Sequence, residues 1–288
     1  MFAATLIARP GQLDAALVQS LRDAWGGGTA IWLSPDEAAE FDLGQVPGNA
    51  DEVWQSLQGQ GVDLVLQPAE GRQKKMLLAD MDSTMIRQEC IDELAAEAGV
   101  GERVAGITAR AMNGELDFEG ALTERVGLLE GLDAGVIDRV LQTRITLMPG
   151  GPELLATMKA NGGHAALVSG GFTAFTTAIA GRLGFDEHRA NTLAIADGKL
   201  TGRVIPPILG REAKVTALNE ITARLGIGPE DVLAVGDGAN DLGMLKAAGT
   251  GVALHAKPSV QAEARHRVNH GDLTALLYLQ GYSREDFA

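Results

Sequence analysis

The sequence predicts an α/β fold: a Rossmann-like doubly wound parallel sheet with a helical insert, preceded by a small α+β unit. Short apolar runs recur along the chain, each ends in small or acidic residues, and a stretch with helical spacing follows. This alternation of strand and helix is typical of a parallel sheet. The chain has 288 residues, of which 45% are hydrophobic and 22% charged, a composition that suffices for about two domains with buried cores.

The expected core strands are short apolar runs that would be buried on both faces of the sheet. They are Met76–Ala79, Ala165–Val168, Val232–Val235 and Val252–Leu254. The helices expected to follow or connect them are Phe172–Leu183, Ala213–Leu225 and Leu242–Ala248. An Asp-Gly pair within Ile195–Leu200 also predicts a hairpin.

Two further stretches complete the predicted organisation. Residues 88–147 have helical spacing and no good strand, so we predict a helical cap over the carboxyl edge of the sheet, with Pro149–Pro152 marking the return to the core. Short apolar segments at Ala4–Ala8, Ala30–Leu33 and Val62–Leu66 predict the small N-terminal α+β domain. The predicted domains are therefore 1–72, a core of 73–87 and 148–288, and a cap of 88–147.

Composition argues against several classes of protein. The 24 basic and 38 acidic residues give a net charge of −14 without a dense basic run, so no nucleic-acid partner is expected. The single cysteine, Cys90, cannot form an internal disulfide, and no secretory signal is evident, which favours the cytoplasm. The longest uncharged stretch, residues 160–181, holds five glycines, so no membrane span is expected. His266 and His270 have metal-ligand spacing but no evident third ligand, so we interpret them as structural or surface histidines.

Two carboxylates follow the first core strand. Asp80 and Asp82 are spaced i and i+2, so they project to one side at the edge where open α/β sheets bind ligands. A divalent cation on Asp80 would keep it ionised while Asp82 holds a proton, giving a nucleophile and an acid. A calcium loop is excluded because Met85 and Ile91 stand where Gly and Glu are required. A plain acidic turn remains the alternative.

Groups suited to an anion follow the second core strand. Ser169–Phe172 places a hydroxyl and free backbone N–H groups immediately before a helix. Lys214, at the start of a later helix, could reach a phosphate oxygen or Asp80 as a point charge. A tight glycine turn and a solvated lysine are the alternative interpretations, and Arg211 is a rival for the role of Lys214.

The segment Gly236–Asp241 follows the third core strand with two carboxylates, Asp237 and Asp241, and the amide of Asn240. Mg²⁺ takes oxygen ligands and keeps several waters, so one or two carboxylates from each of two loops would suffice to bind it. An Asp/Gly turn without a metal is the alternative.

These four elements, in this order and after successive strands, resemble the haloacid dehalogenase-like phosphatases, and most closely the phosphoserine phosphatases of the bacterial SerB type. The likeness covers about Lys74–Leu279. It implies that Asp80 attacks phosphorus to form an aspartyl-phosphate. It also implies that Asp82 protonates the leaving alkoxide and then takes a proton from the hydrolytic water.

The resemblance further implies how the ligands are held. Mg²⁺ would lie on Asp80, the Asp82 carbonyl and Asp237, with Asp241 ordering the waters of the metal. The phosphoryl oxygens would be held by Ser169, the Gly170 N–H and Lys214, with Asn240 beside them.

In the family the cap recognises the amino-acid part of the substrate. The matching positions here are Glu89, Met112, Phe118 and Arg125. A carboxylate suits an ammonium group, and a guanidinium binds a carboxylate in bidentate fashion. Alternatively, Glu89 favours a helix N-terminus, Arg125 is one of many exposed arginines, and Met112 and Phe118 are cap core.

The resemblance therefore implies Mg²⁺-dependent hydrolysis of O-phospho-L-serine to L-serine and inorganic phosphate, the last step of L-serine biosynthesis. The nearest alternative is a related hydrolase or phosphotransferase that acts on another small phosphorylated metabolite. An alternative of another class is a non-catalytic amino-acid sensor. The N-terminal domain loosely resembles the ACT fold that binds amino acids in some of these enzymes. It could bind a regulatory amino acid, form a homodimer interface, or support the catalytic core.

Overall fold

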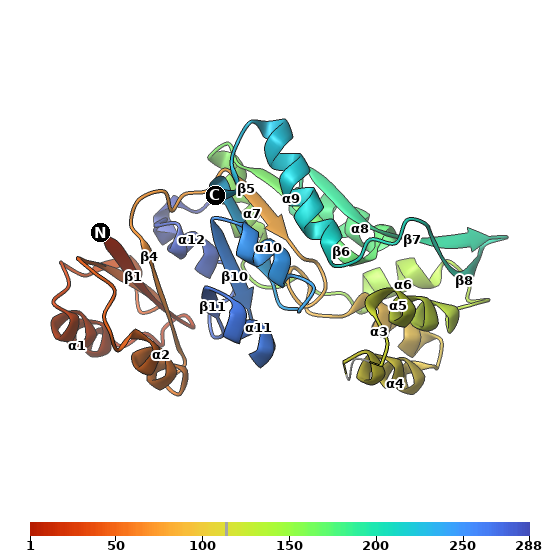
Figure 1. The fold of residues 1–288 in the computed structure, drawn as a ribbon, viewed down its shortest axis with the longest axis horizontal. Coiled ribbons are helices and arrows are strands. Elements are labelled where there is room, and N and C mark those ends of the chain that lie inside the picture. The colour runs from red at the N-terminus through yellow and green to blue at the C-terminus, as the bar shows by residue number, and fades with distance from the viewer. Residues whose placement is uncertain (113–114) are drawn as a thin grey trace.

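The computed structural model describes residues 1–112 and 115–288, with Met112 described by its backbone alone, and shows two separate sheets (Figure 1). The N-terminal sheet has four antiparallel strands in the order β2-β3-β1-β4. Its elements are β1 (Phe2–Ala8), α1 (Ala15–Trp25), β2 (Ile31–Ser34), β3 (Ala38–Leu43), α2 (Ala50–Gln58) and β4 (Val62–Pro68). We call this part the N-terminal unit.

The side chains of β1 alternate between two cores, as a strand covered on both faces requires. Ala4 and Leu6 lie with Val18 and Leu21 of α1 on one face of the N-terminal sheet, whereas Ile7 joins the core of the second sheet. The N-terminal unit is therefore packed against the rest of the chain.

The second sheet has seven strands in the order β11-β10-β9-β5-β6-β7-β8, parallel except for the hairpin of β7 and β8. Its strands are β5 (Met76–Ala79), β6 (His164–Phe172), β7 (Glu187–Ala196), β8 (Lys199–Ile205), β9 (Val232–Gly236), β10 (Thr250–Leu254) and β11 (His266–Val268). Its helices are α7 (Gly151–Ala160), α8 (Thr173–Leu183), α9 (Glu212–Leu225), α10 (Leu242–Ala247), α11 (Pro258–Glu263) and α12 (Ala275–Leu279). Two 3₁₀ helices are Pro229–Asp231 and Arg284–Asp286.

Helices cover both faces of this sheet. Met76 and Leu78 of β5 pack with residues of α9 and α10 on one face, whereas Leu77 and Ala79 pack with residues of α7, α8 and α12 on the other. All four residues of β5 are buried, as expected for a central parallel strand. Figure 1 shows the same arrangement, with α9 and α10 in front of the strands.

In the described part of the chain, five helices stand between β5 and β6, and the first four of them lie beyond the carboxyl end of β5 (Figure 1). These four are α3 (Cys90–Glu97), α4 (Gly101–Met112), α5 (Phe118–Gly127) and α6 (Val136–Thr143). We call them the insert. The two segments that join the insert to the core lie side by side, because Ile86 and Leu147 form an antiparallel bridge.

The predicted fold class is confirmed, and each expected core strand is present; three have nearly the expected bounds, whereas β6 continues from the expected end at Val168 to Phe172 and so includes the segment predicted as a turn. The Asp197-Gly198 pair forms the turn between β7 and β8, with both residues at positive φ. The strand β3 was not predicted, because its sequence Ala-Ala-Glu-Phe-Asp-Leu is poor in β-branched residues. The division into domains 1–72, 73–87 with 148–288, and 88–147 stays a prediction. No helix in the described part of the chain is long and apolar enough to cross a membrane.

Candidate active site

The predicted catalytic side chains meet at the carboxyl ends of three neighbouring strands. Asp80 follows β5, Ser169 lies near the end of β6, and Asp237 follows β9. Since β5 pairs in parallel with both β6 and β9, these ends share one edge of the sheet. The N–H of Asp80 donates to the carbonyl of Val235 at 3.0 Å, which fixes the start of the acidic loop on the sheet.

Lys214 is buried between two of the carboxylates. It lies in the first turn of α9 with only 2% of its side chain exposed. Its Nζ is 2.6 Å from Oδ1 of Asp80 and also pairs with Oδ1 of Asp241. Burial opposes the charge of Lys214, but Asp241 and Asp80 outweigh burial and raise its pKa. The alternative of a solvated lysine is therefore wrong.

Three carboxylates form a cluster that fits a hard divalent cation. Oxygens of Asp80, Asp237 and Asp241 all lie within 4.8 Å of one another. Burial, then the neighbouring charge of Asp241, raises the pKa of Asp237 to about 6 and raises that of Asp80 well above its usual range. The charge of Lys214 cannot neutralise three carboxylates, so an oxygen-ligated cation would relieve their repulsion.

The loop after β9 is shaped around Asp241. The N–H of Gly238 donates to Oδ2 of Asp241 at 2.9 Å, and Asp241 is fully buried. A Cβ at Gly236 would lie 2.3 Å from Cγ of Asp241, so this position requires glycine. Asn240 is half-buried, and its Oδ1 would lie 2.3 Å from a Cβ at Gly238.

Asp82 has a different environment from Asp80, although only one residue separates them. Its Oδ1 accepts a hydrogen bond from the backbone N–H of Cys90 at 3.2 Å. Burial, then the charge of Glu89, raises the pKa of Asp82 to about 7. The side chain of Asp82 lies outside the three-carboxylate cluster, so a cation bound by the cluster would favour the ionised form of Asp80 more than that of Asp82.

Two hydroxyls of the same loop support these groups. Ser83 has a φ of 57°, which turns the chain, and its Oγ donates to Oε1 of Glu89 at 2.7 Å. Thr84 is buried, and its Oγ1 donates to Oδ1 of Asp237 at 3.3 Å. The role of Thr84 was missed, because a threonine beside two aspartates gives no signal of its own in the sequence.

The predicted anion-binding segment is held by a hydrogen bond within it and by another from β7. The N–H of Gly171 donates to Oγ of Ser169 at 2.9 Å. Asn191 holds the turn from the side: its amide donates to the carbonyl of Gly170 at 2.9 Å and accepts from the N–H of Leu209 at 2.7 Å. Asn191 was also missed, because it lies on β7, away from every motif.

The insert brings side chains to the same edge. Phe118, the first residue of α5, stands over the turn, since a Cβ at Gly170 would lie 3.1 Å from its Cζ. Arg125 is half-buried and donates through Nε to the carbonyl of Ala121 at 3.2 Å. Burial lowers the pKa of Arg125, against the opposing charges of Asp92 and Glu89.

The two remaining residues predicted to bind the amino-acid part of the substrate are Glu89 and Met112. Glu89 is exposed beside Ser83, so its carboxylate is free to face a ligand. The side chain of Met112, with residues 113 and 114, lies outside the described residues. The roles assigned to all these side chains stay predictions.

Comparison with known proteins supports the likeness. Residues 77–246 match the family model of the haloacid dehalogenase-like hydrolases. A phosphoserine phosphatase of Streptomyces coelicolor is 46% identical over 228 residues, which span 78% of this chain but only 55% of that protein. A solved HAD family hydrolase of Salmonella enterica serovar Typhi has a TM-score of 0.87 at 32% identity, covering 97% of this chain and 98% of its own. A solved phospho-aspartyl intermediate analogue of a phosphoserine phosphatase has a TM-score of 0.67 at 43% identity, covering 72% of this chain and 98% of its own.

Proposed function

Because the chain belongs to the haloacid dehalogenase-like hydrolases, we propose that it is a phosphoserine phosphatase. It would hydrolyse O-phospho-L-serine to L-serine and inorganic phosphate, the last step of L-serine biosynthesis. One observation supports this proposal above the others. Two aspartates on one loop have unlike environments, Asp80 against the Lys214 ammonium and Asp82 with a pKa raised to about 7.

Asp80 is the proposed nucleophile. Burial and Asp241 raise the pKa of Asp80, while the Lys214 ammonium, and a cation bound by the cluster, would favour its ionised form; Lys214 holds one carboxylate oxygen, so the other can attack phosphorus. The bond from phosphorus to the serine oxygen breaks as the bond to Asp80 forms. This step leaves an aspartyl-phosphate and a seryl alkoxide, which needs a proton.

Asp82 is the proposed proton donor and acceptor. With a pKa raised to about 7, both of its forms are populated at neutral pH. Asp82 gives its proton to the alkoxide, and serine leaves. It then takes a proton from the water that attacks phosphorus, the bond to Asp80 breaks, and phosphate is released.

The non-bridging phosphoryl oxygens need donors, since phosphoryl transfer depends mainly on positioning and charge neutralisation. We assign these contacts to the Ser169 hydroxyl, the Gly170 N–H and the Lys214 ammonium, with Asn240 at the edge. Asn191 supports the turn through its hydrogen bond to the Gly170 carbonyl, and the N–H and carbonyl of Leu209 hold the Asn191 side chain itself.

The donor set of the acidic cluster fits Mg²⁺, because it is made of two buried carboxylates and one half-buried carboxylate with excess negative charge. Asp80, the Asp82 carbonyl and Asp237 would hold the ion, and Asp241 would order its waters and Lys214. When bound, Mg²⁺ supplies positive charge that offsets the repulsion between the carboxylates and a phosphate dianion. The chain itself supplies the Lys214 charge and the N–H groups.

We propose that the insert binds the amino-acid part of phosphoserine. Arg125 would bind the substrate carboxylate and Glu89 its ammonium group, while Phe118 and Met112 enclose the carbon chain. The opposite charges of Arg125 and Glu89 suit a zwitterion, and the position of Phe118 above Gly170 places this region next to the phosphate turn.

A cytoplasmic location fits the chemistry of the chain, whose one cysteine, Cys90, is buried and forms no disulfide in the described structure. A homodimer stays a prediction that gel filtration with light scattering can test. The assignment of residues 1–72 as an ACT-like domain also stays a prediction.

The function is tested by product analysis across phosphorylated amino acids, sugars and glycerol phosphate, with and without an alcohol acceptor. We expect L-serine and phosphate in equal amounts from phosphoserine, with a kcat/KM at least about tenfold above every other substrate. A better substrate among the sugars, or transfer to the alcohol, would favour the related hydrolase or phosphotransferase. No turnover of any substrate with Mg²⁺ present would favour the sensor.

A further inference from the structure

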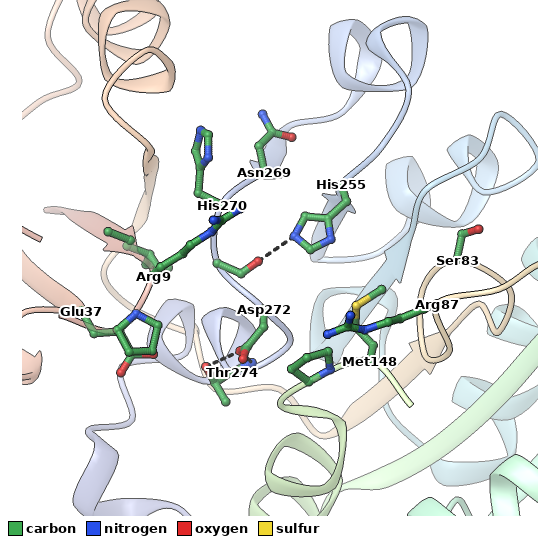
Figure 2. A pocket seen from close by; sticks show the side chains of 15 residues that line it. Arg9, Glu37, Ser83, Arg87, Met148, His255, Asn269, His270, Asp272 and Thr274 are labelled. Carbon is green, nitrogen blue, oxygen red and sulfur yellow. Dashed lines mark hydrogen bonds between the residues drawn. The ribbon is translucent and has the colours of Figure 1, made fainter. Parts of the chain in front are cut away.

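A cavity of about 670 Å³ lies between the N-terminal unit and the core, apart from the acidic cluster (Figure 2). It is lined by the end of β1 and the loop after it, by Glu37 before β3, by both segments that join the insert to the core, by His255 after β10 and by the turn after β11. They contribute, among others, Arg9, His255, Asp272, Arg87 and Met148. None of the three clustered carboxylates is among the described residues that line this cavity.

Two guanidinium groups reach into the cavity from opposite walls. Figure 2 shows Arg9 extending from the N-terminal unit and Arg87 extending toward it from the segment before the insert. Within residues 1–112 and 115–288, neither forms an ion pair or a side-chain hydrogen bond. Two such groups facing one solvent-filled space favour a bound carboxylate or phosphate.

The acidic residues of the cavity are already engaged. Oε2 of Glu37 accepts hydrogen bonds from Oγ of Ser34 at 2.7 Å and from the Tyr278 hydroxyl at 3.0 Å. Oδ1 of Asp272 accepts from the N–H and Oγ1 of Thr274 at 2.8 and 2.6 Å. Among the described residues of this cavity, the charged side chains of Arg9 and Arg87 have no partner, and an anion would supply one; the buried Oδ1 of Asn269 and Nε2 of His270 also lack a partner.

The walls of the cavity are held together by buried hydrogen bonds. Asp63 of β4 is fully buried and accepts from the backbone N–H groups of Asn269, His270 and Gly271 at 2.8 to 2.9 Å. This contact fixes the N-terminal unit against the turn after β11. The cavity is thus a preformed space between fixed walls, as small-molecule sites usually are.

The cavity also adjoins the connections of the insert. The N–H of Arg87 donates to the Thr146 carbonyl at 3.0 Å, and that of Met148 donates to the Met85 carbonyl at 2.9 Å. Ser83, the neighbour of Asp82, lines the cavity as well. A ligand held by Arg87 would therefore touch the segment through which the insert is joined to the catalytic loop.

We propose that this cavity binds a small anionic metabolite through a carboxylate or phosphate group held between Arg9 and Arg87. The bound anion stiffens the connection of the insert and so changes how phosphoserine is bound. The binding statement is independent of the proposed function; only this kinetic effect rests on it.

Isothermal titration calorimetry of the full chain tests the binding, with malonate as the carboxylate probe and inorganic phosphate as the phosphate probe. We expect at least one probe to bind, and R9Q and R87Q each to raise its Kd by at least about tenfold. Both arginines are exposed, so the variants should fold. Circular dichroism of each variant checks this. R103Q, on the exposed face of α4, is the matched control and should leave Kd unchanged.

Binding of malonate alone or phosphate alone supports the proposal and identifies the class of anion when R9Q and R87Q weaken it; binding that neither variant changes belongs to the catalytic site and overturns the proposal. If neither probe binds at millimolar concentration, or if R125Q abolishes binding while R9Q and R87Q do not, the proposal is overturned. In the kinetic arm, the probe that binds should shift the KM for phosphoserine in wild type by at least about twofold beyond the shift that the same probe causes in R9Q, which reports competition at the catalytic site alone. If the probe binds but does not shift the KM in this way, only the proposed effect of the anion on phosphoserine binding is rejected.

Discussion

At the scale of single residues, the central feature is the contrast between Asp80 and Asp82. Their shared loop brings both to one edge, but Asp80 faces Lys214 whereas Asp82 faces the N–H of Cys90 and the charge of Glu89. The sequence predicts that they differ, since two identical carboxylates cannot both be acid and nucleophile. The partners that separate them are visible only in the structure.

D80N removes the proposed nucleophile while keeping the shape of the side chain. We expect kcat to fall by at least about a thousandfold. Because burial and Asp241 raise the pKa of Asp80, its charge is unfavourable in the folded metal-free protein. The melting temperature of metal-free D80N at pH 7 should therefore equal or exceed that of wild type. An inactive variant that also melts much lower would show damage to the fold instead.

R125A tests whether Arg125 binds the carboxylate of phosphoserine. It should lower kcat/KM for phosphoserine by about a hundredfold, as expected for a lost charge-assisted hydrogen-bond pair. For p-nitrophenyl phosphate, which has no amino-acid part, the loss should stay below about threefold. R103A, in the same insert, serves as the control. Equal losses on both substrates would assign Arg125 a structural role.

His266 should contribute to the pH dependence of stability. Burial, then the positive charges of Arg265, Lys74 and Arg267, lowers its pKa from 6.5 to about 4. The folded state therefore favours the neutral ring, and stability falls as pH drops from 6.5 toward 4. Between pH 7 and 5 this loss amounts to about 2 kcal/mol.

Urea unfolding of wild type and H266Q at pH 7 and pH 5 isolates this contribution, because the other titrating groups are common to both proteins. The variant should lose less stability than wild type over this interval. Equal losses in the two proteins would contradict the buried neutral state of His266.

At the scale of elements, the strands were predictable where burial on two faces imposes a continuous apolar run, as in Met76–Ala79. The same reasoning misses β3, whose Ala, Glu and Asp residues are placed in a strand by pairing with β1. It also misses Asn191, because its contacts depend on how β7 lies beside β6. Local pattern thus predicts the elements, whereas tertiary contacts select their supporting residues.

Gly150, just before α7, lies where the chain passes very close to the backbone of Thr274. It has a φ of 79°, and a Cβ there would lie 2.5 Å from the backbone nitrogen of Thr274. Gly162 has a nearly equal φ of 77° but nothing within 4 Å. G162A should cost about 1 kcal/mol from the left-handed backbone alone. G150A should cost about 2 kcal/mol more because of the clash.

Urea unfolding of both glycine variants measures this difference, because the backbone strain is nearly the same in the two and cancels. A G150A protein as stable as G162A would show that the return segment from the insert is not fixed against Thr274.

At the scale of the whole molecule, the net charge of −14 does not prevent the binding of a phosphate dianion. Distant surface charges are screened, while Lys214 and the N–H groups of the turn act at close range. Three of the negative charges lie in the acidic cluster, where they could bind a divalent cation. The position of the N-terminal unit could not be predicted, because Asp63 meets its partner Asn269 206 residues later in the chain.

The account depends on a covalent bond between Asp80 and the phosphoryl group, which a trapping experiment tests most directly. The protein is mixed with ³²P-labelled phosphoserine and Mg²⁺, quenched in acid within milliseconds, reduced with borohydride and mapped by mass spectrometry. The account predicts label in the quenched protein and, after reduction, conversion of Asp80 to homoserine. No label during active turnover, or a modification at any other residue, would contradict it.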